Sequence, residues 1–270
     1  MDNRAIGVFD SGLGGITAAY VLSALLPDEH IIYLGDSHNM PYGEKSREQI
    51  IAMSERNLQF LLEKDVKAVF VACGTATSNA LESLENKSPV PVFGVVEPAC
   101  LEAAAATKSG KIGLLATKAS VEAGAYQKFL RALSPQISVT EKACPRFATM
   151  VEDGIFDKND ERVREAAAEY LPTLVRAGVD TVILGCTHYP LLADIITEHM
   201  GSNVKLISAG AAAARSLCTH LKQNKLTAIN GTSKTEYYTT GEATSFARTA
   251  KLMLRRDISG ELTQIAPFSL

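Results

Sequence analysis

Short continuous apolar runs recur along the chain, and most of them precede a stretch with helical spacing of its apolar positions. Such runs are typical of strands that are buried on both faces of a parallel sheet. The strands predicted in this way are Ala5–Phe9, Ile31–Leu34, Ala68–Ala72, Val92–Val96, Lys111–Ala116, Ser138–Lys142, Thr181–Leu184 and Val204–Ile207. Because they alternate with helices, the pattern predicts an α/β protein with helices on both faces of parallel sheets.

Four stretches between these strands have the clearest helical pattern. They are Arg47–Leu62, Ser120–Ala132, Glu161–Ala177 and Ala211–Leu221. Pro172 lies inside the third stretch, where the missing N–H of proline predicts a kink. The segment NKLTAINGTSKTE, residues 224–236, has the strongest loop character.

The sequence also resembles itself at two offsets. Residues 65–75, DVKAVFVACGT, match residues 178–188, GVDTVILGCTH, at an offset of 113, which places Cys73 over Cys186. Residues 6–20 resemble residues 112–126 at an offset of 106. The two matches occur in the same order, which indicates two copies of one set of βα units. Two such halves facing each other would bring their strand ends to one cleft, where open α/β sheets bind ligands.

The composition is that of an ordinary globular protein, with 46% hydrophobic and 21% charged residues in a chain of 270. The net charge is -3 and no cluster of Lys and Arg stands out, so no nucleic-acid partner is expected. No apolar run approaches the ~20 residues of a membrane span, so no membrane association is expected. The first predicted strand begins close to residue 1, which leaves no room for a signal peptide.

Five cysteines occur at widely scattered positions, and their number is odd. This pattern argues against a disulfide framework and favours reduced thiols in the cytoplasm. No two of them have CxxC spacing and the chain contains five His, so a structural zinc site is not expected.

Two of the cysteines have a special context. Cys73 and Cys186 each follow a predicted strand and precede small or hydroxyl-bearing residues, in VACGTAT and LGCTHYP. A cysteine is often only a small buried hydrophobe. Here, however, both thiols precede a helix, whose N-terminal N–H groups favour a thiolate and bind carboxylates. His188 could exchange a proton with Cys186. The cysteines that lack this context are interpreted as packing residues: Cys100, Cys144 and Cys218.

Three further polar positions lie beside predicted strands or turns. Asp10 opens the segment DSGLGG and is either a helix cap or a catalytic group. The glycines suggest a dinucleotide site, but Thr17 stands at the third glycine position and the Lys of a P-loop is absent, so we reject that interpretation. Tyr42, in the loop YLGDSHNMPYGEKS, offers an oriented hydroxyl. Glu152 follows a Cys-Pro turn and is a lone acid.

Two thiols that face each other across a cleft can perform a reaction that one thiol cannot. With a substrate carbon about 3–3.5 Å from each, the sulfurs would lie roughly 6–7 Å apart. This distance forbids a disulfide, whose S–S bond is about 2 Å long. One thiolate would remove a proton from one face of the carbon while the opposite thiol protonates the other, which inverts a stereocentre. Asp10 and His188 are the neighbours that could set the protonation state of each thiol.

These residues match a known family. The chain closely resembles the cofactor-independent glutamate racemases of the aspartate/glutamate racemase superfamily over essentially its whole length. The shared segments, in order, are GVFDSGLGG, PYG, ACGTAT, GVVEPA, the pattern CP-F--MVE and LGCTHYPLL. The resemblance implies two pseudo-symmetric parallel-sheet α/β domains with the active site in the cleft between them. We expect residues 1–97 and 209–270 to form the first domain, and residues 98–208 the second.

The resemblance also implies an activity and the residues that carry it. The enzyme would interconvert L- and D-glutamate without a cofactor or metal, and would supply D-glutamate for bacterial peptidoglycan. Cys73 and Cys186 would transfer the protons, assisted by Asp10, Glu152 and His188. The positions that would bind glutamate are Asp10, Ser11, Tyr42, Gly43, Gly74, Thr75, Thr187 and His188. We expect a homodimer in the cytoplasm.

The chain departs from the family pattern at two places. The family usually reads ACNTAT, so Gly74 lacks an amide side chain that could hold the substrate. We expect water to fill the space beside Gly74, and an Asn there to lower the Michaelis constant or leave it unchanged. The segment LISAGAAAARSL, residues 206–217, lacks the acidic residues that the family commonly carries before its last helix.

Other functions remain compatible with these residues. An aspartate racemase or an arylmalonate-type decarboxylase would use the same fold, although a decarboxylase needs only one proton donor. A non-catalytic binding protein would not require both thiols, Asp10 and the CTHYP segment. A Cys–His hydrolase would pair Cys186 with His188. Residues two apart at a strand end need not face each other, however, and Cys73 would then have no role.

Overall fold

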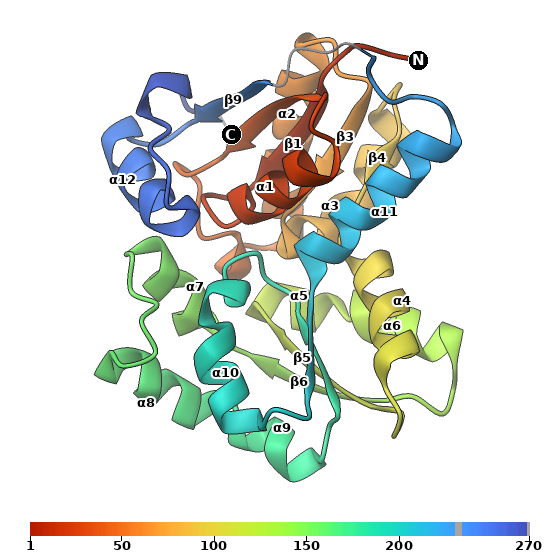
Figure 1. Ribbon diagram of the computed structural model, residues 1–270, viewed down its shortest axis with the longest axis vertical. Helices are drawn as coiled ribbons and strands as arrows, with labels where there is room; N and C mark the ends of the chain where they lie inside the picture. Colours follow the sequence, from red (N-terminus) through yellow and green to blue (C-terminus); the bar gives the residue numbers. More distant parts are fainter. Residues whose placement is uncertain (230–233, 269–270) are drawn as a thin grey trace.

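The computed structural model describes residues 1–229 and 234–268 and contains two β-sheets (Figure 1). The larger has the order β10-β9-β2-β1-β3-β4, from β1 Ile6–Asp10, β2 His30–Gly35, β3 Ala68–Val71, β4 Val92–Phe93, β9 Lys234–Thr239 and β10 Leu262–Gln264. The smaller has the order β6-β5-β7-β8, from β5 Lys111–Ala116, β6 Ser138–Ala143, β7 Thr181–Leu184 and β8 Lys205–Ser208. All of these strand pairs are parallel, which confirms the predicted fold class.

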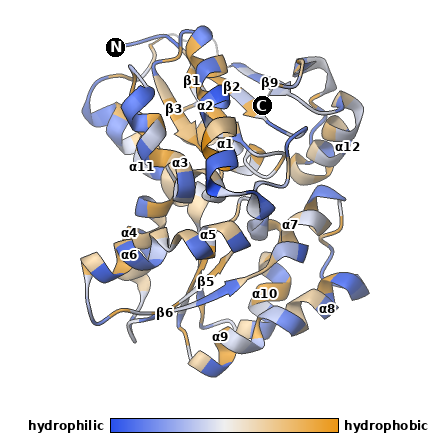
Figure 2. Ribbon diagram, turned by 180° about the vertical axis from the view of Figure 1, so that it is seen from behind, coloured by the Kyte–Doolittle hydropathy of each residue, from blue (hydrophilic) through white to orange (hydrophobic). Residues whose placement is uncertain are grey.

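Helices enclose both sheets. Those before β5 are α1 Ile16–Leu25, α2 Arg47–Glu63, α3 Gly74–Lys87 and α4 Val96–Ala106, with a 3-10 turn, η1, at Tyr42–Glu44. Those between β5 and β8 are α5 Lys118–Ala123, α6 Ala125–Leu133, α7 Pro145–Glu152, α8 Glu161–Tyr170, α9 Pro172–Ala177, η2 Tyr189–Leu192 and α10 Ala193–Met200. After β8 come α11 Ala209–Gln223, α12 Ala243–Leu254 and η3 Ser259–Glu261. In Figure 2 the central strands β1, β3 and β5 have mostly apolar colours, β6 is largely polar, and the helices carry both polar and apolar residues. Within the described residues, no helix combines the length and apolar character needed to cross a membrane.

The two sheets repeat one arrangement of four strands. β1 lies between β2 and β3 in the larger sheet, as β5 lies between β6 and β7 in the smaller. β4 and β8 then extend the two sheets in the same sense. The two internal sequence matches fall on β1 with β5 and on β3 with β7, so the repeat inferred from the sequence is confirmed. β9 and β10 extend the larger sheet beyond β2.

β9 and β10 are absent from the strands that the apolar pattern predicts. β9 reads KTEYYT and β10 reads LTQ, so neither contains a continuous apolar run. The predicted loop at residues 224–236 is wrong at its end, because Lys234 begins β9 and pairs with His30 of β2; its residues 230–233 lie outside the described residues. The predicted strand Val92–Val96 is also too long, since Val96 already begins α4.

Two predicted helices are each divided at one residue. The stretch Glu161–Ala177 separates into α8 and α9, and α9 begins at Pro172, where the missing N–H interrupts the helical hydrogen bonds. The stretch Ser120–Ala132 divides at Gly124, whose φ of 64° ends α5 before α6 begins. Glycine adopts this left-handed conformation without the cost that a Cβ imposes.

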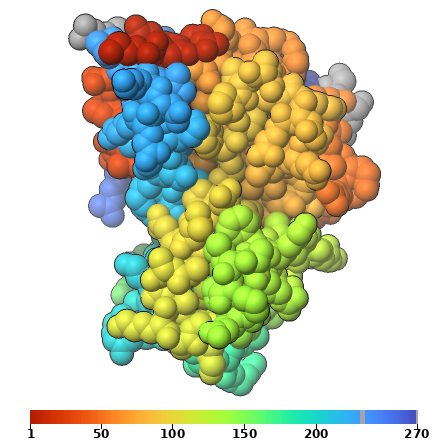
Figure 3. Space-filling view, turned by 90° about the vertical axis from the view of Figure 1, so that its right-hand side faces the viewer, coloured from red at the N-terminus to blue at the C-terminus, as the bar shows by residue number. Residues whose placement is uncertain are grey.

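The chain connects the two halves through α4, which follows β4, and through α11, which follows β8. These helices lie side by side on one face of the molecule (Figure 3). One hydrophobic cluster joins Ile6 of β1 and Ile112 of β5 to residues of both helices, so the two halves share a core. The domain boundaries at residues 97 and 209 stay a prediction.

The alanine-rich segment 206–217 has a packing role. Ser208 caps α11 by accepting a hydrogen bond from the backbone N–H of Ala211 at 3.3 Å. Gly210 lets α11 approach α1, because a Cβ there would lie 2.9 Å from the Cβ of Ala18. Gly210 at the start of α11 therefore allows the close approach of α11 and α1.

A buried ion pair lies next to the start of β3 and contacts the segment that follows α11. Lys67 Nζ lies 2.6 Å from a carboxylate oxygen of Glu29 and also donates to the carbonyl oxygens of Asp2 and Leu226. Both side chains of the pair are almost fully buried. Removing one member of such a pair leaves an uncompensated charge in the interior.

We expect Lys67→Met to lower the free energy of unfolding by about 3–5 kcal/mol, because the Glu29 carboxylate would stay buried without its partner. Denaturant unfolding followed by circular dichroism measures the change. Lys128→Met, at an exposed position of α6, is the control and should change the free energy by less than about 0.5 kcal/mol. Equal effects of the two substitutions would contradict this role of the ion pair.

Candidate active site

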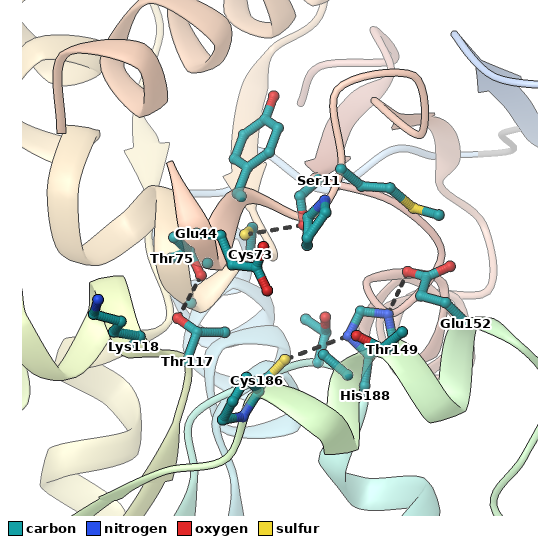
Figure 4. Close-up of a pocket in the computed structure, with 18 of the residues that line it drawn as sticks. Ser11, Glu44, Cys73, Thr75, Thr117, Lys118, Thr149, Glu152, Cys186 and His188 are labelled. Carbon is teal, nitrogen blue, oxygen red and sulfur yellow. Dashed lines mark hydrogen bonds and ion pairs between the residues drawn. The ribbon is translucent and has the colours of Figure 1, made fainter. Parts of the chain in front are cut away.

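Cys73 and Cys186 line one small cavity from the two halves of the molecule (Figure 4). Cys73 follows β3 and is the N-cap of α3, and Cys186 lies just beyond the end of β7. The cavity has a volume of about 150 Å³. Sites for drug-sized ligands are typically ~300–1,000 Å³, so this cavity suits a smaller molecule.

The lining comes from segments that follow the carboxyl ends of β1, β2, β3, β5, β6 and β7, where α/β sheets bind ligands. It comprises Ser11, Met40, Pro41, Tyr42, Gly43, Glu44, Cys73, Gly74, Thr75, Thr117, Lys118, Pro145, Ala148, Thr149, Glu152, Asp153, Cys186, Thr187 and His188. Every position predicted to act on or bind the substrate is among them except Asp10. Across the described residues, no group of three or more His, Cys, Asp and Glu is arranged to hold a metal ion.

Cys73 is held as a thiol in its resting environment. Its sulfur accepts a hydrogen bond from the N–H of Ala76 at 3.4 Å and donates to the hydroxyl of Ser11 at 3.6 Å. Burial, reinforced by the nearby Asp10 charge, raises the pKa of Cys73 to about 12. Burial therefore keeps the Cys73 sulfur protonated here, although its place at the N-terminus of α3 favours a thiolate.

Cys186 belongs to a chain of three side chains. His188 Nδ1 lies 3.3 Å from the Cys186 sulfur, and His188 Nε2 lies 2.5 Å from a carboxylate oxygen of Glu152. Burial alone would lower the pKa of His188, but the charges of Glu152 and Cys186 raise it well above its ordinary value. His188 therefore stays an imidazolium that can donate to both neighbours. Cys186 and His188 therefore face each other, although residues two apart at a strand end need not do so.

Glu152 is the anion that keeps His188 protonated. Burial would raise the pKa of Glu152, but the His188 charge and hydrogen bond lower it below its usual value. The same carboxylate oxygen accepts the N–H of Leu13 from the other half at 3.2 Å. Glu152 therefore links His188 of the second half to the loop that follows β1.

Asp10 lies behind the cavity wall. Its side chain is fully buried, and it accepts hydrogen bonds from the N–H of Gly12 at 3.1 Å and from the hydroxyl of Thr187 at 3.4 Å. Burial raises the pKa of Asp10, an effect that the positive charge of His188 opposes. Asp10 thus orients the loops that carry Ser11 and Thr187, and in this structure it has no surface in the cavity.

The hydroxyl of Tyr42 is already engaged. It donates to Asp36 at 2.5 Å and accepts from the side chain of Asn57 at 3.0 Å. Asp36 also accepts from the hydroxyl of Thr240, which follows β9, at 2.7 Å. The hydroxyl that the sequence suggests as a ligand group instead fixes the segment that includes Gly43, so this segment offers the cavity its backbone rather than a free phenol.

The sequence interpretation missed several lining residues, and an available signal could have found Thr117. The offset of 106 places Thr117 on Ser11, since 11 plus 106 is 117. The Thr117 hydroxyl lies 2.9 Å from that of Thr75, across the boundary between the two halves (Figure 4). Lys118 and Glu44 also line the cavity, and no pattern in the sequence marked them.

Gly74 has no open space beside it. Its φ is not positive, so a side chain would meet no backbone strain. A Cβ on Gly74 would nevertheless lie 2.0 Å from the carbonyl oxygen of Gly185. The expectation of a water-filled space is wrong, and an Asn at this position would displace the backbone opposite.

The fold and site define an α/β protein of two pseudo-symmetric halves that present one thiol each to a small cavity. The family described as Asp/Glu/Hydantoin racemase matches residues 17–217. The chain belongs to this family, which confirms the resemblance drawn from the sequence.

The chain also matches individual proteins over nearly the full length of both chains. The chain is 42% identical over 274 residues to a glutamate racemase of Lactococcus lactis subsp. lactis, covering 100% of this chain and 99% of the relative. It matches the crystal structure of a glutamate racemase from Bacillus anthracis with a TM-score of 0.94 and 35% identity, covering 100% of both chains. The glutamate racemase of Francisella tularensis in complex with D-glutamate gives a TM-score of 0.90 and 31% identity, again over 100% of both chains.

We expect Glu152→Gln to lower the pKa of His188, because the Glu152 charge is the main cause that raises it. In the unchanged protein, His188 should hold its proton throughout neutral pH and lose it only in alkaline solution. In the variant, it should lose the proton at a lower pH. Nitrogen-15 NMR of the imidazole across a pH series measures both. Glu82→Gln, at an exposed position, should leave the His188 titration unchanged; an equal titration in Glu152→Gln would refute this pairing.

Proposed function

We propose that this protein interconverts L- and D-glutamate by moving the α-proton between Cys73 and Cys186. The observation that carries the proposal is that equivalent strand ends of the two halves each present a thiol to one small cavity. The relatives described above are named glutamate racemases, and they support the choice of substrate. The cavity volume of about 150 Å³ suits a molecule of this size.

The two sulfurs can together carry out a complete proton transfer. In one direction, a Cys186 thiolate takes the α-proton, and the electron pair of the broken C–H bond stays on the α-carbon, delocalised into its carboxylate. The Cys73 thiol then donates its proton to the opposite face, which leaves the other enantiomer, a Cys186 thiol and a Cys73 thiolate. The reverse reaction uses the same two groups with their roles exchanged, and exchange of the thiol protons with water restores the starting protonation states for the next turnover in the same direction.

The neighbours of each sulfur support these roles. His188 can donate to the Cys186 sulfur at 3.3 Å and so compensates negative charge there. Cys73 enters the reaction as a proton donor, since burial and Asp10 raise its pKa to about 12. When Cys73 becomes the thiolate, the N–H of Ala76 and the hydroxyl of Ser11 are the groups that can stabilise it.

The substrate carboxylates have partners in the same cavity. The N-terminus of α3, at Gly74 and Thr75, offers backbone N–H groups and the positive end of the helix dipole. Ser11 and Thr187 add hydroxyls, and Tyr42 and Gly43 also line the cavity. Such groups suit an amino acid that carries two carboxylates.

The rival readings explain less of the site. A Cys–His hydrolase gains support from the contact between Cys186 and His188, but it gives Cys73 no role. A decarboxylase uses one proton donor, and a binding protein needs no thiol at all. Racemisation of aspartate would use the same groups, and the experiments below separate it from racemisation of glutamate.

The resemblance to glutamate racemases also supports a wider proposal. The enzyme would work without a cofactor, supply D-glutamate for peptidoglycan, and act as a homodimer in the cytoplasm. Light scattering of the purified protein tests the dimer.

We expect Cys73→Ala and Cys186→Ala each to reduce racemisation by about 10²- to 10⁴-fold, because each removes one of the two proton-transfer groups. Polarimetry with L- and D-glutamate measures the rates. Cys100→Ala, at a buried cysteine outside the cavity lining, should retain activity. Near-wild-type racemisation by either cavity variant would show that the two-thiol mechanism is wrong.

We expect incubation with L-glutamate in D₂O to yield D-glutamate that carries deuterium at the α-carbon, because the second proton comes from a thiol that exchanges with solvent. The same activity should survive dialysis against a chelator and need no added pyridoxal phosphate. NMR and chiral chromatography measure the products. Faster racemisation of aspartate than of glutamate would overturn the substrate, and no exchange with either would leave a binding protein.

A further inference from the structure

Two glycines bring the chain on either side of the cavity into direct contact. Gly74 follows Cys73, and Gly185 precedes Cys186. A Cβ on Gly74 would lie 2.0 Å from the carbonyl oxygen of Gly185 and 3.2 Å from its carbonyl carbon. Because a C–C bond is about 1.5 Å long, the Gly74 Cα lies no more than about 3.5 Å from that oxygen. The backbones that carry the two thiols therefore touch.

The Gly185 side of this contact has little freedom to move. Its N–H donates to the carbonyl oxygen of Leu115 in β5 at 2.8 Å, and its carbonyl oxygen accepts from the hydroxyl of Tyr126 at 3.3 Å. A Cβ on Gly185 would itself lie 3.1 Å from the Leu115 carbonyl oxygen. Tyr126 is fully buried. Gly185 is thus held against β5 and α6.

The Gly74 side is equally fixed. Gly74 is the first residue of α3, and Cys73 caps that helix by accepting the N–H of Ala76. A side chain on Gly74 would therefore meet backbone on a rigid strand end, and could not be relieved by rotating a flexible side chain. It would have to push the two halves apart.

The position equivalent to Gly74 in the second half also lies close to the opposite half, but it carries a side chain. Thr187 occupies the place of Gly74 in the second half, since 74 plus 113 is 187. Thr187 has room for its side chain because Gly14 faces it: a Cβ on Gly14 would lie 2.3 Å from the Thr187 hydroxyl oxygen. At both of these contacts between the halves one partner is a glycine, and at Gly74 both partners are.

We propose that Gly74, through its contact with Gly185, is a positioning residue that sets the distance between the Cys73 and Cys186 sulfurs. The catalytic part of this inference rests on the proposed function. A methyl group at position 74 needs at least 3.0 Å from the carbonyl oxygen, where 2.0 Å is available. The difference, 3.0 − 2.0, separates the strand ends by about 1 Å, and a misplacement of 1 Å can cost about 10²-fold in rate.

The first test is Gly74→Ala, with Gly260→Ala as the matched control. Gly260 has nothing within 4 Å of an added Cβ. We expect Gly74→Ala to lower kcat about 10²-fold in both directions, with a smaller rise in KM because the Gly74 and Thr75 N–H groups move together with Cys73. Gly260→Ala should keep both constants. An unchanged kcat in Gly74→Ala would overturn the proposal.

A second measurement separates this proposal from the proposed function. Crystal structures of the unchanged protein and of Gly74→Ala give the distance between the two sulfurs directly, whatever the substrate. We expect that distance to be larger in the variant by about 1 Å, following the clash distances given above. An equal distance would refute the positioning role even if glutamate racemisation is confirmed. A larger distance in a protein that racemises nothing would refute the function alone.

Two further variants keep the test informative if Gly74→Ala folds poorly. Tyr126→Phe removes the hydroxyl that holds the Gly185 carbonyl. In the double variant Gly74→Ala/Tyr126→Phe, the carbonyl can therefore turn away from the new methyl group. We expect the double variant to fold and to recover part of kcat relative to Gly74→Ala. Gly74→Asn should lose kcat at least as strongly as Gly74→Ala, because it carries the same Cβ. A kcat of Gly74→Asn at or above that of the unchanged protein would contradict the proposal.

Discussion

The carboxyl ends of two parallel sheets face each other, and the rest of the site depends on that arrangement. Helices begin where parallel strands end, so each sheet offers loops and helix N-termini at this edge. The larger sheet contributes Ser11 after β1 and Cys73 after β3, and the smaller contributes Thr117 after β5 and Cys186 after β7. The repeat of one four-strand unit makes these positions equivalent. A reaction centre between them therefore has a similar group on each face.

The repeat places the thiols symmetrically, but their neighbours differ. At the offset of 106, Asp10 corresponds to Ala116, and at the offset of 113, Thr75 corresponds to His188. The acid therefore lies near Cys73, whose pKa it helps burial to raise, and the imidazolium lies beside Cys186. Local substitutions within a symmetric frame therefore place different charged groups beside the two sulfurs.

The sequence predicts those parts of the fold that depend on local pattern. The central strands β1, β3, β5 and β7 are buried and carry continuous apolar runs, so pattern alone identifies them, whereas β6 reads SVTEKA and has no buried residue. β9 has alternating polar residues, and its place in the sheet is decided by pairing with β2, which no local pattern reveals. The division of one helix at Gly124 likewise depends on a backbone angle that the sequence permits but does not require.

Prediction of the site from the sequence is limited in the same way. The internal repeat could have identified Thr117 as a site residue. The hydrogen bond from Tyr42 to Asp36, in contrast, depends on how a loop folds back on itself. The contact of Gly74 with Gly185 joins residues that are 111 positions apart, as 185 − 74 shows, and glycine leaves no apolar or polar mark of its partner. Backbone contacts between residues that are far apart in the sequence cannot be predicted from local sequence pattern.

A bare backbone contact also changes how the site can hold a carboxylate. An amide side chain at position 74 would offer one neutral hydrogen bond, typically worth about 0.5–1.5 kcal/mol. The contact with Gly185 instead leaves no room for that amide, because a Cβ at position 74 would lie 2.0 Å from a backbone oxygen. The donors that remain at this position are the backbone N–H groups of Gly74 and Thr75, which begin α3 and line the cavity. Their strength as donors to an anion comes from the helix N-terminus and not from a side chain.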